Sequence, residues 1–406
     1  MITEEQTELL VEKILKRVEE ANAYFLKNIG QKVRAIGELN STEAQQLIQI
    51  LKYGGSYDEI IKEIAKYTGL TINDIDEIFQ AYARKDQLFY KQFYKYRNKP
   101  FIPYDENIAL KRQTEALTNM VKTEAYNFTR DNVLGYTING EFKGLRETYN
   151  ELLDTALLNV GQGKQTYEAG VADILRQIGG SGLKTIEYES GRAVRLDSAI
   201  RMHLKGRLRE LHNENQKLLG QEFGADGVEI SVHDNPAPDH EEAQGRQFSN
   251  QEYEKLNSGM EAIDYKGNRY TLDHDDNGSY RPISEMNCFH RIFSIILGVS
   301  QPLKTDEQLQ KIRDDNNKGF ELDGKHYTNY QGTQLQRQIE REIRKQKDIQ
   351  ILAKNAGNNE LIAESQSNIT ALTNKYRKVA QVSGLPTKAE RLRVSGYKRV
   401  AKSKLK

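Results

Sequence analysis

Apolar residues recur at three- and four-residue spacing through most of this chain, and this period indicates amphipathic helices that pack along one face. The clearest run covers residues 4–37, with apolar side chains at Leu10, Ile14, Leu15, Val18, Phe25, Ile29, Val33 and Ile36. Thr42 and Gln45 have the spacing of a capping box, and Gly54 is predicted to end the helix that they begin. The same period predicts helices at residues 57–67, 72–97, 107–130, 141–160, 166–178, 193–220 and 331–353. The chain is therefore predicted to be mainly α.

A second period occurs in the middle of the chain. Val228, Ile230 and Val232 alternate with polar residues, as in a half-buried strand. Residues 265–270 have the composition of a hairpin turn, and residues 288–297 form an apolar segment. The prediction is a small α+β central module between an extended multi-helix N-terminal part and a helical, basic C-terminal part. We place the three regions at 1–130, 131–302 and 303–406.

Charge is distributed unevenly along the chain. The 59 basic and 58 acidic residues nearly cancel, but residues 303–406 hold 22 basic and 12 acidic residues, a net charge of +10. Its last part is a polycation opposed only by Glu390, with Lys375, Arg377, Lys378, Lys388, Arg391, Arg393, Lys398, Arg399, Lys402, Lys404 and Lys406. Such a segment is expected to bind double-stranded DNA non-specifically, because phosphate contacts release condensed counterions. The alternative is a solvated terminus that is basic for solubility.

Cysteine usage and hydropathy indicate the kind of cellular compartment in which the chain is expected to fold. Cys288 is the only cysteine, so no internal disulfide can form, which fits a reducing compartment. No run approaches the roughly 18 apolar residues of a membrane-spanning helix. Glu4, Glu5 and Glu8 lie where a signal peptide would be basic and then apolar. We expect no membrane-spanning segment and no export signal.

Three ordered blocks of residues in the middle of the chain carry a resemblance to a known family. They are Gly191 and Arg192; then Pro238, His240, Gln244, Gly245 and Arg246; then Asn287, Cys288 and His290. This order resembles the phage minor capsid proteins that are related to the head morphogenesis protein F of phage Mu. Residues 131–302 would then be the Mu F-like core.

The resemblance implies a non-catalytic structural protein of a tailed bacteriophage. Its expected partners are the portal protein, the major capsid or scaffold protein, and double-stranded DNA. Its expected location is the capsid interior of the virion, after assembly in the host bacterial cytoplasm. The expected contribution is to head morphogenesis and to packaging or release of the genome.

Two chemical alternatives remain open within these blocks. His233, His240, Cys288 and His290 have the ligand types of a tetrahedral zinc site, although hydrogen bonding within a small sheet explains the same residues and is favoured. No other cofactor is expected. Asp273 and His274, then Asn287, then His290 are similar to a His-Asn-His nuclease motif, in which one histidine activates water and a metal holds the phosphate. A polar turn at residues 272–280 explains His274 more simply.

The segment from Tyr82 to Lys99 interleaves aromatic and basic residues, which suits nucleic acid because aromatic faces stack on bases and cations meet phosphates. The same spacing predicts an ordinary buried stripe made of Tyr82, Phe89, Phe93 and Tyr96, with solvated lysines opposite. The stripe is the favoured interpretation, because it explains the spacing without a ligand.

Overall fold

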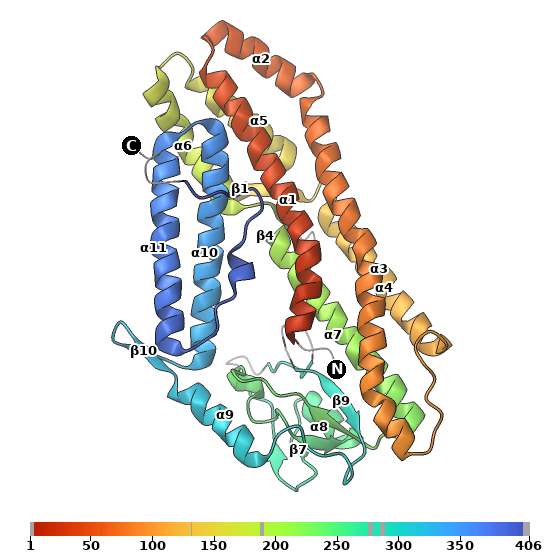
Figure 1. Ribbon diagram of the computed structural model, residues 1–406. Helices are drawn as coiled ribbons and strands as arrows, with labels where there is room; N and C mark the ends of the chain where they lie inside the picture. The colour runs from red at the N-terminus through yellow and green to blue at the C-terminus, as the bar shows by residue number, and fades with distance from the viewer. Residues whose placement is uncertain are drawn as a thin grey trace. The chain divides into compact units, whose positions relative to one another are not determined.

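The structure is a computed structural model that describes residues 4–130, 132–186, 191–274, 279–284, 288 and 290–400. Within these residues the chain is mainly helical (Figure 1). The α-helices are α1 (Glu4–Gly37), α2 (Ser41–Tyr53), α3 (Ser56–Tyr96), α4 (Ile108–Thr129), α5 (Leu145–Leu158), α6 (Lys164–Ser181), α7 (Leu196–Phe223), α8 (Asn250–Asn257), α9 (Asp306–Lys318), α10 (Asn329–Ala356) and α11 (Asn359–Ser383). Two short 3-10 helices are η1 (Pro238–His240) and η2 (Ala389–Leu392).

The strands are short, and every pairing among them is antiparallel. They are β1 (Leu134–Ile138), β2 (Glu141–Gly144), β3 (Lys184–Ile186), β4 (Ala193–Arg195), β5 (Gly227–Ile230), β6 (Gln247–Ser249), β7 (Ala262–Ile263), β8 (Arg269–Tyr270), β9 (Ile292–Ile295), β10 (Phe320–Leu322) and β11 (Lys325–Tyr327). The predicted class, mainly α with a small α+β module, is confirmed.

The chain divides into two compact units, and each unit combines three separate segments. Unit 1 contains residues 1–11, 75–121 and 202–334, and unit 2 contains residues 12–74, 122–201 and 335–406. Both units take segments from all three regions expected from the sequence, so the consecutive division at 1–130, 131–302 and 303–406 stays a prediction.

Unit 1 contains a three-stranded sheet in the order β6-β5-β9. All four residues of the central strand β5 are buried, including Glu229. The Glu229 carboxylate accepts hydrogen bonds from Gln247 Nε2 at 2.9 Å and from the Leu303 N–H at 2.6 Å. The half-buried strand predicted from alternation is therefore wrong, because the polar position is also covered and hydrogen-bonded. The strand also ends at Ile230, before Val232.

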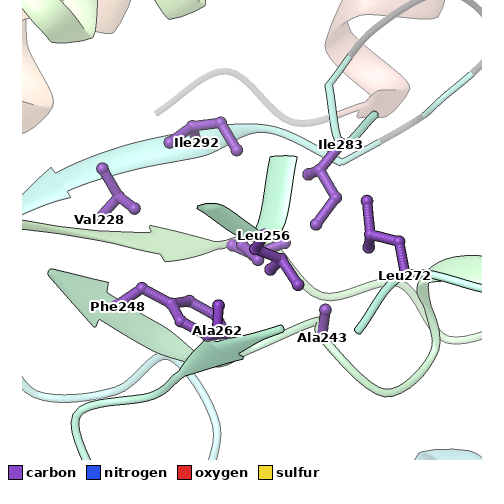
Figure 2. Packing of buried hydrophobic residues seen from close by; sticks show 9 residues of the cluster. Val228, Ala243, Phe248, Leu256, Ala262, Leu272, Ile283 and Ile292 are labelled. Carbon is purple, nitrogen blue, oxygen red and sulfur yellow. The ribbon is translucent and has the colours of Figure 1, made fainter. Parts of the chain in front are cut away.

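The β module contains a cluster of buried apolar residues. Among the described residues, nine buried side chains belong to it: Val228, Ile230, Ala243, Phe248, Leu256, Ala262, Leu272, Ile283 and Ile292. Figure 2 shows Phe248 and Ala262 gathered near Leu256 of α8. The predicted hairpin is confirmed, since β7 pairs with β8 around a turn that contains Gly267 at φ +91°.

The helical part of unit 1 is organised by aromatic residues. Phe93 of α3 stacks on Phe223 of α7 at 5.1 Å between ring centroids. Asp86, buried on the same helix, contacts His212 Nδ1 at 2.8 Å. The predicted stripe is partly wrong: Tyr82 is buried, but Tyr96 is 56% exposed and Phe89 and Phe93 are half-buried. Tyr90 and Tyr94 are the buried residues instead, because four-residue spacing from Tyr82 continues the face on which Asp86 lies.

Unit 2 contains a four-stranded sheet in the order β2-β1-β3-β4. In β1, Gly135 lies opposite Gly144, and a Cβ at Gly135 would stand 2.0 Å from the carbonyl oxygen of Lys143, so the close approach of the strands requires glycine. Helices α10 and α11 lie side by side (Figure 1), and hydrogen bonds from Tyr376 to Glu340 and from Gln350 to Gln366 show that they run antiparallel.

Buried charges join several elements of unit 2. Arg195 contacts Asp197 at 3.3 Å and Asp348 at 3.1 Å, and Arg344 forms a further ion pair with Asp197. Together with Glu19 of α1, these side chains line a small cavity with room for about one water molecule. Buried ions that are paired in this way hold their elements in one arrangement, because removing one partner leaves a buried charge uncompensated.

Helix boundaries differ from the predicted ones at several points. The two helices expected at 57–67 and 72–97 are the single helix α3, because a lone glycine, here Gly69, costs a helix only about 1 kcal/mol. The capping box is formed by Asn40 and Glu43 and not by Thr42 and Gln45, since Asn40 has the extended backbone of an N-cap. The helices predicted at 141–160 and 193–220 each begin with a short strand, β2 or β4.

No helix in the described part of the chain has both the length and the apolar character needed to cross a membrane.

Candidate functional site

The topology of the unit 1 sheet brings two connecting segments to one of its ends, namely residues 231–246 between β5 and β6 and the residues before β9. Because β5 is antiparallel to both neighbours, its C-terminal end lies beside the N-terminal ends of β6 and β9. His233 follows β5, Gln244 precedes β6, and His290 precedes β9. The polar residues that the sequence analysis singled out in separate blocks therefore meet at this end.

A buried cysteine lies between two histidines at this position. Cys288 Sγ is 3.3 Å from His240 Nδ1 and 3.4 Å from His290 Nδ1. The three residues are at most 3% exposed. One potential ligand atom from each lies within 4.8 Å of the other two. We call these three residues the Cys-His cluster.

The second nitrogen of each histidine is held by an oxygen of the protein. His240 Nε2 donates a hydrogen bond to the carbonyl oxygen of Arg281 at 2.6 Å. His290 Nε2 lies 3.4 Å from Oε1 of Gln244. That oxygen also accepts the backbone N–H of His233 at 2.9 Å, which fixes the orientation of the amide. Both imidazoles are therefore oriented with Nδ1 toward the sulfur.

His233 lies at the edge of the cluster. Its ring is half-buried, and its centroid is 4.6 Å from that of His290. The four residues predicted as metal ligands therefore lie close together. His233 contacts the ring of His290 but is not part of the group of three whose ligand atoms lie within 4.8 Å of one another.

The environment of the cluster shifts its pKa values in different directions. Burial raises the pKa of the Cys288 thiol, but the hydrogen bond and charge of His240 outweigh burial, so the pKa lies below its ordinary value. Burial lowers the pKa of His240, but its contacts with Cys288 give a net increase. Burial and the charges of His233 and His240 hold the pKa of His290 well below its ordinary range. His290 is therefore a neutral imidazole.

Other residues of the recognised blocks shape the loops around the cluster. Gly245 has φ +71°, and a Cβ there would stand 2.6 Å from Leu309. Arg246 forms an ion pair with Asp306 at 2.5 Å. Pro238 begins η1, which carries His240. These three residues support the cluster, because each restricts the backbone conformation or anchors a loop beside it.

The remaining block residues lie elsewhere. Gly191, at φ +65°, and the exposed Arg192 belong to unit 2. Asn287 lies outside the described residues.

The two described histidines of the nuclease alternative differ in their exposure and in their contacts. His274 is exposed and forms an isolated β-bridge with Tyr280, whereas His290 is buried with its Nδ1 toward Cys288. Asn287, the third residue of that motif, is among the residues that the structure does not describe.

The basic C-terminal segment is attached to unit 2 as far as Val400. The Lys388 N–H donates to the Tyr376 hydroxyl at 2.9 Å, and the Val400 N–H donates to Gln366 Oε1 at 3.2 Å. Six of the predicted DNA-binding cations are exposed, namely Lys375, Arg377, Lys378, Arg393, Lys398 and Arg399. Lys388 is half-buried, and Arg391 lies 3.8 Å from Glu340. Lys402, Lys404 and Lys406 lie outside the described residues.

Sequence reasoning missed two groups of residues. The role of Gln244 and the Arg281 carbonyl in orienting the histidines depends on contacts across 46 and 41 positions in the chain. The buried ion pairs of Arg195, Asp197 and Asp348 could have been suspected, because charged residues stand there among apolar helix positions.

A comparison with family models gives one match for this chain: a family described as phage minor capsid protein 2 matches residues 2–380. No curated protein matches the chain, and neither does any solved structure.

Proposed function

Since the chain belongs to the phage minor capsid protein 2 family, and so has a structural role in the virion, we propose that it works on the inside of the capsid. Its proposed partners there are the portal protein and the major capsid or scaffold protein. It would contribute to head morphogenesis and to packaging or release of the genome, without catalysing a reaction. The observation that carries the proposal is the extent of the family match, which includes segments of both units.

The distribution of charge supports a contact with packaged DNA. Residues 375–399 present the six exposed cations named above, on α11 and on the segment after it. The backbone beneath them is anchored, so these cations form a surface of unit 2 up to Val400. Non-specific binding to duplex phosphates is the interaction that suits such a surface.

The finer relation to protein F of phage Mu is also part of this proposal. It depends on the ordered blocks around His240, Gly245 and Cys288, which form one connected site in unit 1. A shared arrangement of these residues would explain the resemblance in their order.

A packaged nuclease is the alternative that we do not adopt. The motif needs its histidines at one centre, whereas His274 is exposed and His290 is 3% exposed with its Nδ1 directed at Cys288 Sγ. Incubation with plasmid DNA and Mg²⁺ or Mn²⁺ checks this choice. Nicking that disappears in His274→Ala would require the nuclease function instead.

Co-expression with the portal protein of the same phage tests the proposed partner. The full chain is required, because each unit combines three segments that are far apart in the sequence. We expect the portal to co-purify with the full chain in high salt, where non-specific charge contacts are screened. If both proteins are folded and elute separately, the portal is not the partner.

A further inference from the structure

The spacing within the Cys-His cluster matches that of ligands around a tetrahedral ion. With Zn–S of about 2.3 Å and Zn–N of about 2.0 Å, a tetrahedral site places sulfur and nitrogen about 3.5 Å apart. Cys288 Sγ lies 3.3 Å and 3.4 Å from the two Nδ1 atoms. Little movement of the side chains would therefore be needed to admit an ion between them.

The two histidines present the same ring nitrogen to one sulfur. The Gln244 oxygen, whose orientation is fixed by the His233 N–H, lies 3.4 Å from His290 Nε2, and the Arg281 carbonyl oxygen lies 2.6 Å from His240 Nε2. Nδ1 of each ring therefore faces Sγ of Cys288. One cation at this position would contact all three atoms, which lie within 4.8 Å of one another.

The orientation of the histidines is the one that metal sites use. A ligating imidazole commonly donates its other N–H to a carbonyl or similar oxygen, which fixes its tautomer and direction. Arg281 supplies that oxygen for His240, and Gln244 supplies it for His290. The positive side chain of Arg281 does not oppose a cation at full strength, because Asp239 holds it through two hydrogen bonds of 2.8 Å.

We propose that His240 Nδ1, Cys288 Sγ and His290 Nδ1 bind one zinc ion, and that His233 supplies the fourth ligand. Imidazole and thiolate donors in a tetrahedral arrangement select zinc over Mg²⁺, Ca²⁺ or Mn²⁺, which take oxygen ligands. Four protein ligands make a closed, structural site. The inference is independent of the function proposed above.

The position of the site explains why a small module would use a metal. The three strands of the β module are three or four residues long, and the buried cluster beside them has nine residues among those that the structure describes. Small cores supply little net stability, and a structural metal is one of the ways in which proteins compensate. The ion would join the β5–β6 connection, which carries His233 and His240, to the segment before β9, which carries Cys288 and His290.

The test measures metal content in the full chain, purified without a histidine tag. We expect about one zinc per chain, and a cobalt-substituted protein with visible bands of tetrahedral cobalt and a near-ultraviolet thiolate-to-cobalt band. Cys288→Ser should hold less than a tenth of an equivalent. His326→Ala removes an exposed histidine of the same unit and should bind as the parent chain does.

Two further variants separate this site from surface binding and from simple misfolding. Gln244→Ala keeps all ligands and should weaken zinc affinity by about 10- to 100-fold, as the loss of an orienting contact does. His233→Ala should weaken affinity while keeping the thiolate-to-cobalt band. Chelation of the parent chain should lower its melting temperature reversibly, and zinc should restore it.

Three results would overturn the proposal. The first is a parent chain, refolded with zinc, that holds less than a tenth of an equivalent. The second is zinc that Cys288→Ser and the parent chain retain alike. The third is cobalt bound without a thiolate band, which would identify adventitious metal only.

Discussion

Glu19 of α1 makes the stability of unit 2 depend on pH. Burial raises its pKa from 4.5 to about 7, and the charges of Asp197, Asp348 and Glu12 act in the same direction, while Arg344 opposes them. Arg195 and Arg344 already pair with Asp197 and Asp348, so an ionised Glu19 adds a further negative charge to this buried cluster. Lys347, whose own pKa is lowered by burial, also interacts with Glu19.

The direction of the effect follows from the raised pKa. Below pH 4.5 the carboxyl is protonated in both the folded and the unfolded chain, and its contribution to stability is fully present. As pH rises toward 7, the unfolded chain releases this proton before the folded chain does, so stability falls. The full shift corresponds to about 3 kcal/mol, and roughly 2 kcal/mol should be lost between pH 5 and pH 8 after allowance for partial solvent screening.

Glu19→Gln imitates the protonated carboxyl and removes the titration. Urea unfolding of both proteins at pH 5, 6, 7 and 8 should show the variant gaining on the parent chain by about 2 kcal/mol across this range. Glu38→Gln, at a side chain that is 66% exposed, serves as the matched control and should leave the difference unchanged with pH. The free energy of unfolding of Glu19→Gln minus that of the parent chain should increase with pH. A difference that stays constant or decreases as pH rises would refute this reasoning.

Three other predictions concern unit 1 and the basic surface. Asp86→Ala removes the carboxylate that contacts the buried His212 and should lower the free energy of unfolding by about 3 to 5 kcal/mol. A loss below about 1 kcal/mol in a urea titration would show that the Asp86–His212 pair is not buried. Ile230→Ala should cost about 2 to 5 kcal/mol, whereas Ile263→Ala, at a 40% exposed position, should cost much less, and equal thermal shifts would contradict the packing of β5. Binding of the parent chain to duplex DNA, measured by fluorescence anisotropy, should show a slope of log affinity against log salt of about −5. Glutamine at all six exposed cations should abolish this slope, and an unchanged slope would place the DNA contact elsewhere. The six positions are Lys375, Arg377, Lys378, Arg393, Lys398 and Arg399.

Long helices were predictable from sequence because one period persists over many residues. The apolar positions from Ile14 to Ile36 identify α1, and its observed end at Gly37 agrees with the predicted range. Strands β3 and β4 have three residues each, which is too short for a period of two to stand out. Their pairing is a long-range property, since β3 joins β1 across some fifty residues of chain.

The candidate site was predictable as a set of residue types and not as a geometry. His240, Cys288 and His290 were recognisable because their side chains can bind metals. The sheet order β6-β5-β9, which brings them to one end, has no signature in the sequence. Neither does the amide orientation of Gln244, which depends on the His233 backbone and decides which nitrogen of His290 faces the sulfur.

The central claim is that this chain is a minor structural component of the phage head. Quantitative mass spectrometry of purified, DNase-treated particles tests it most directly, with the major capsid protein as the internal standard. The chain should be present in DNA-filled heads at a small fraction of the major capsid protein, and a brief protease treatment of intact particles should leave it undigested. Its absence from purified heads, while it is abundant in the infected cell, would contradict the account.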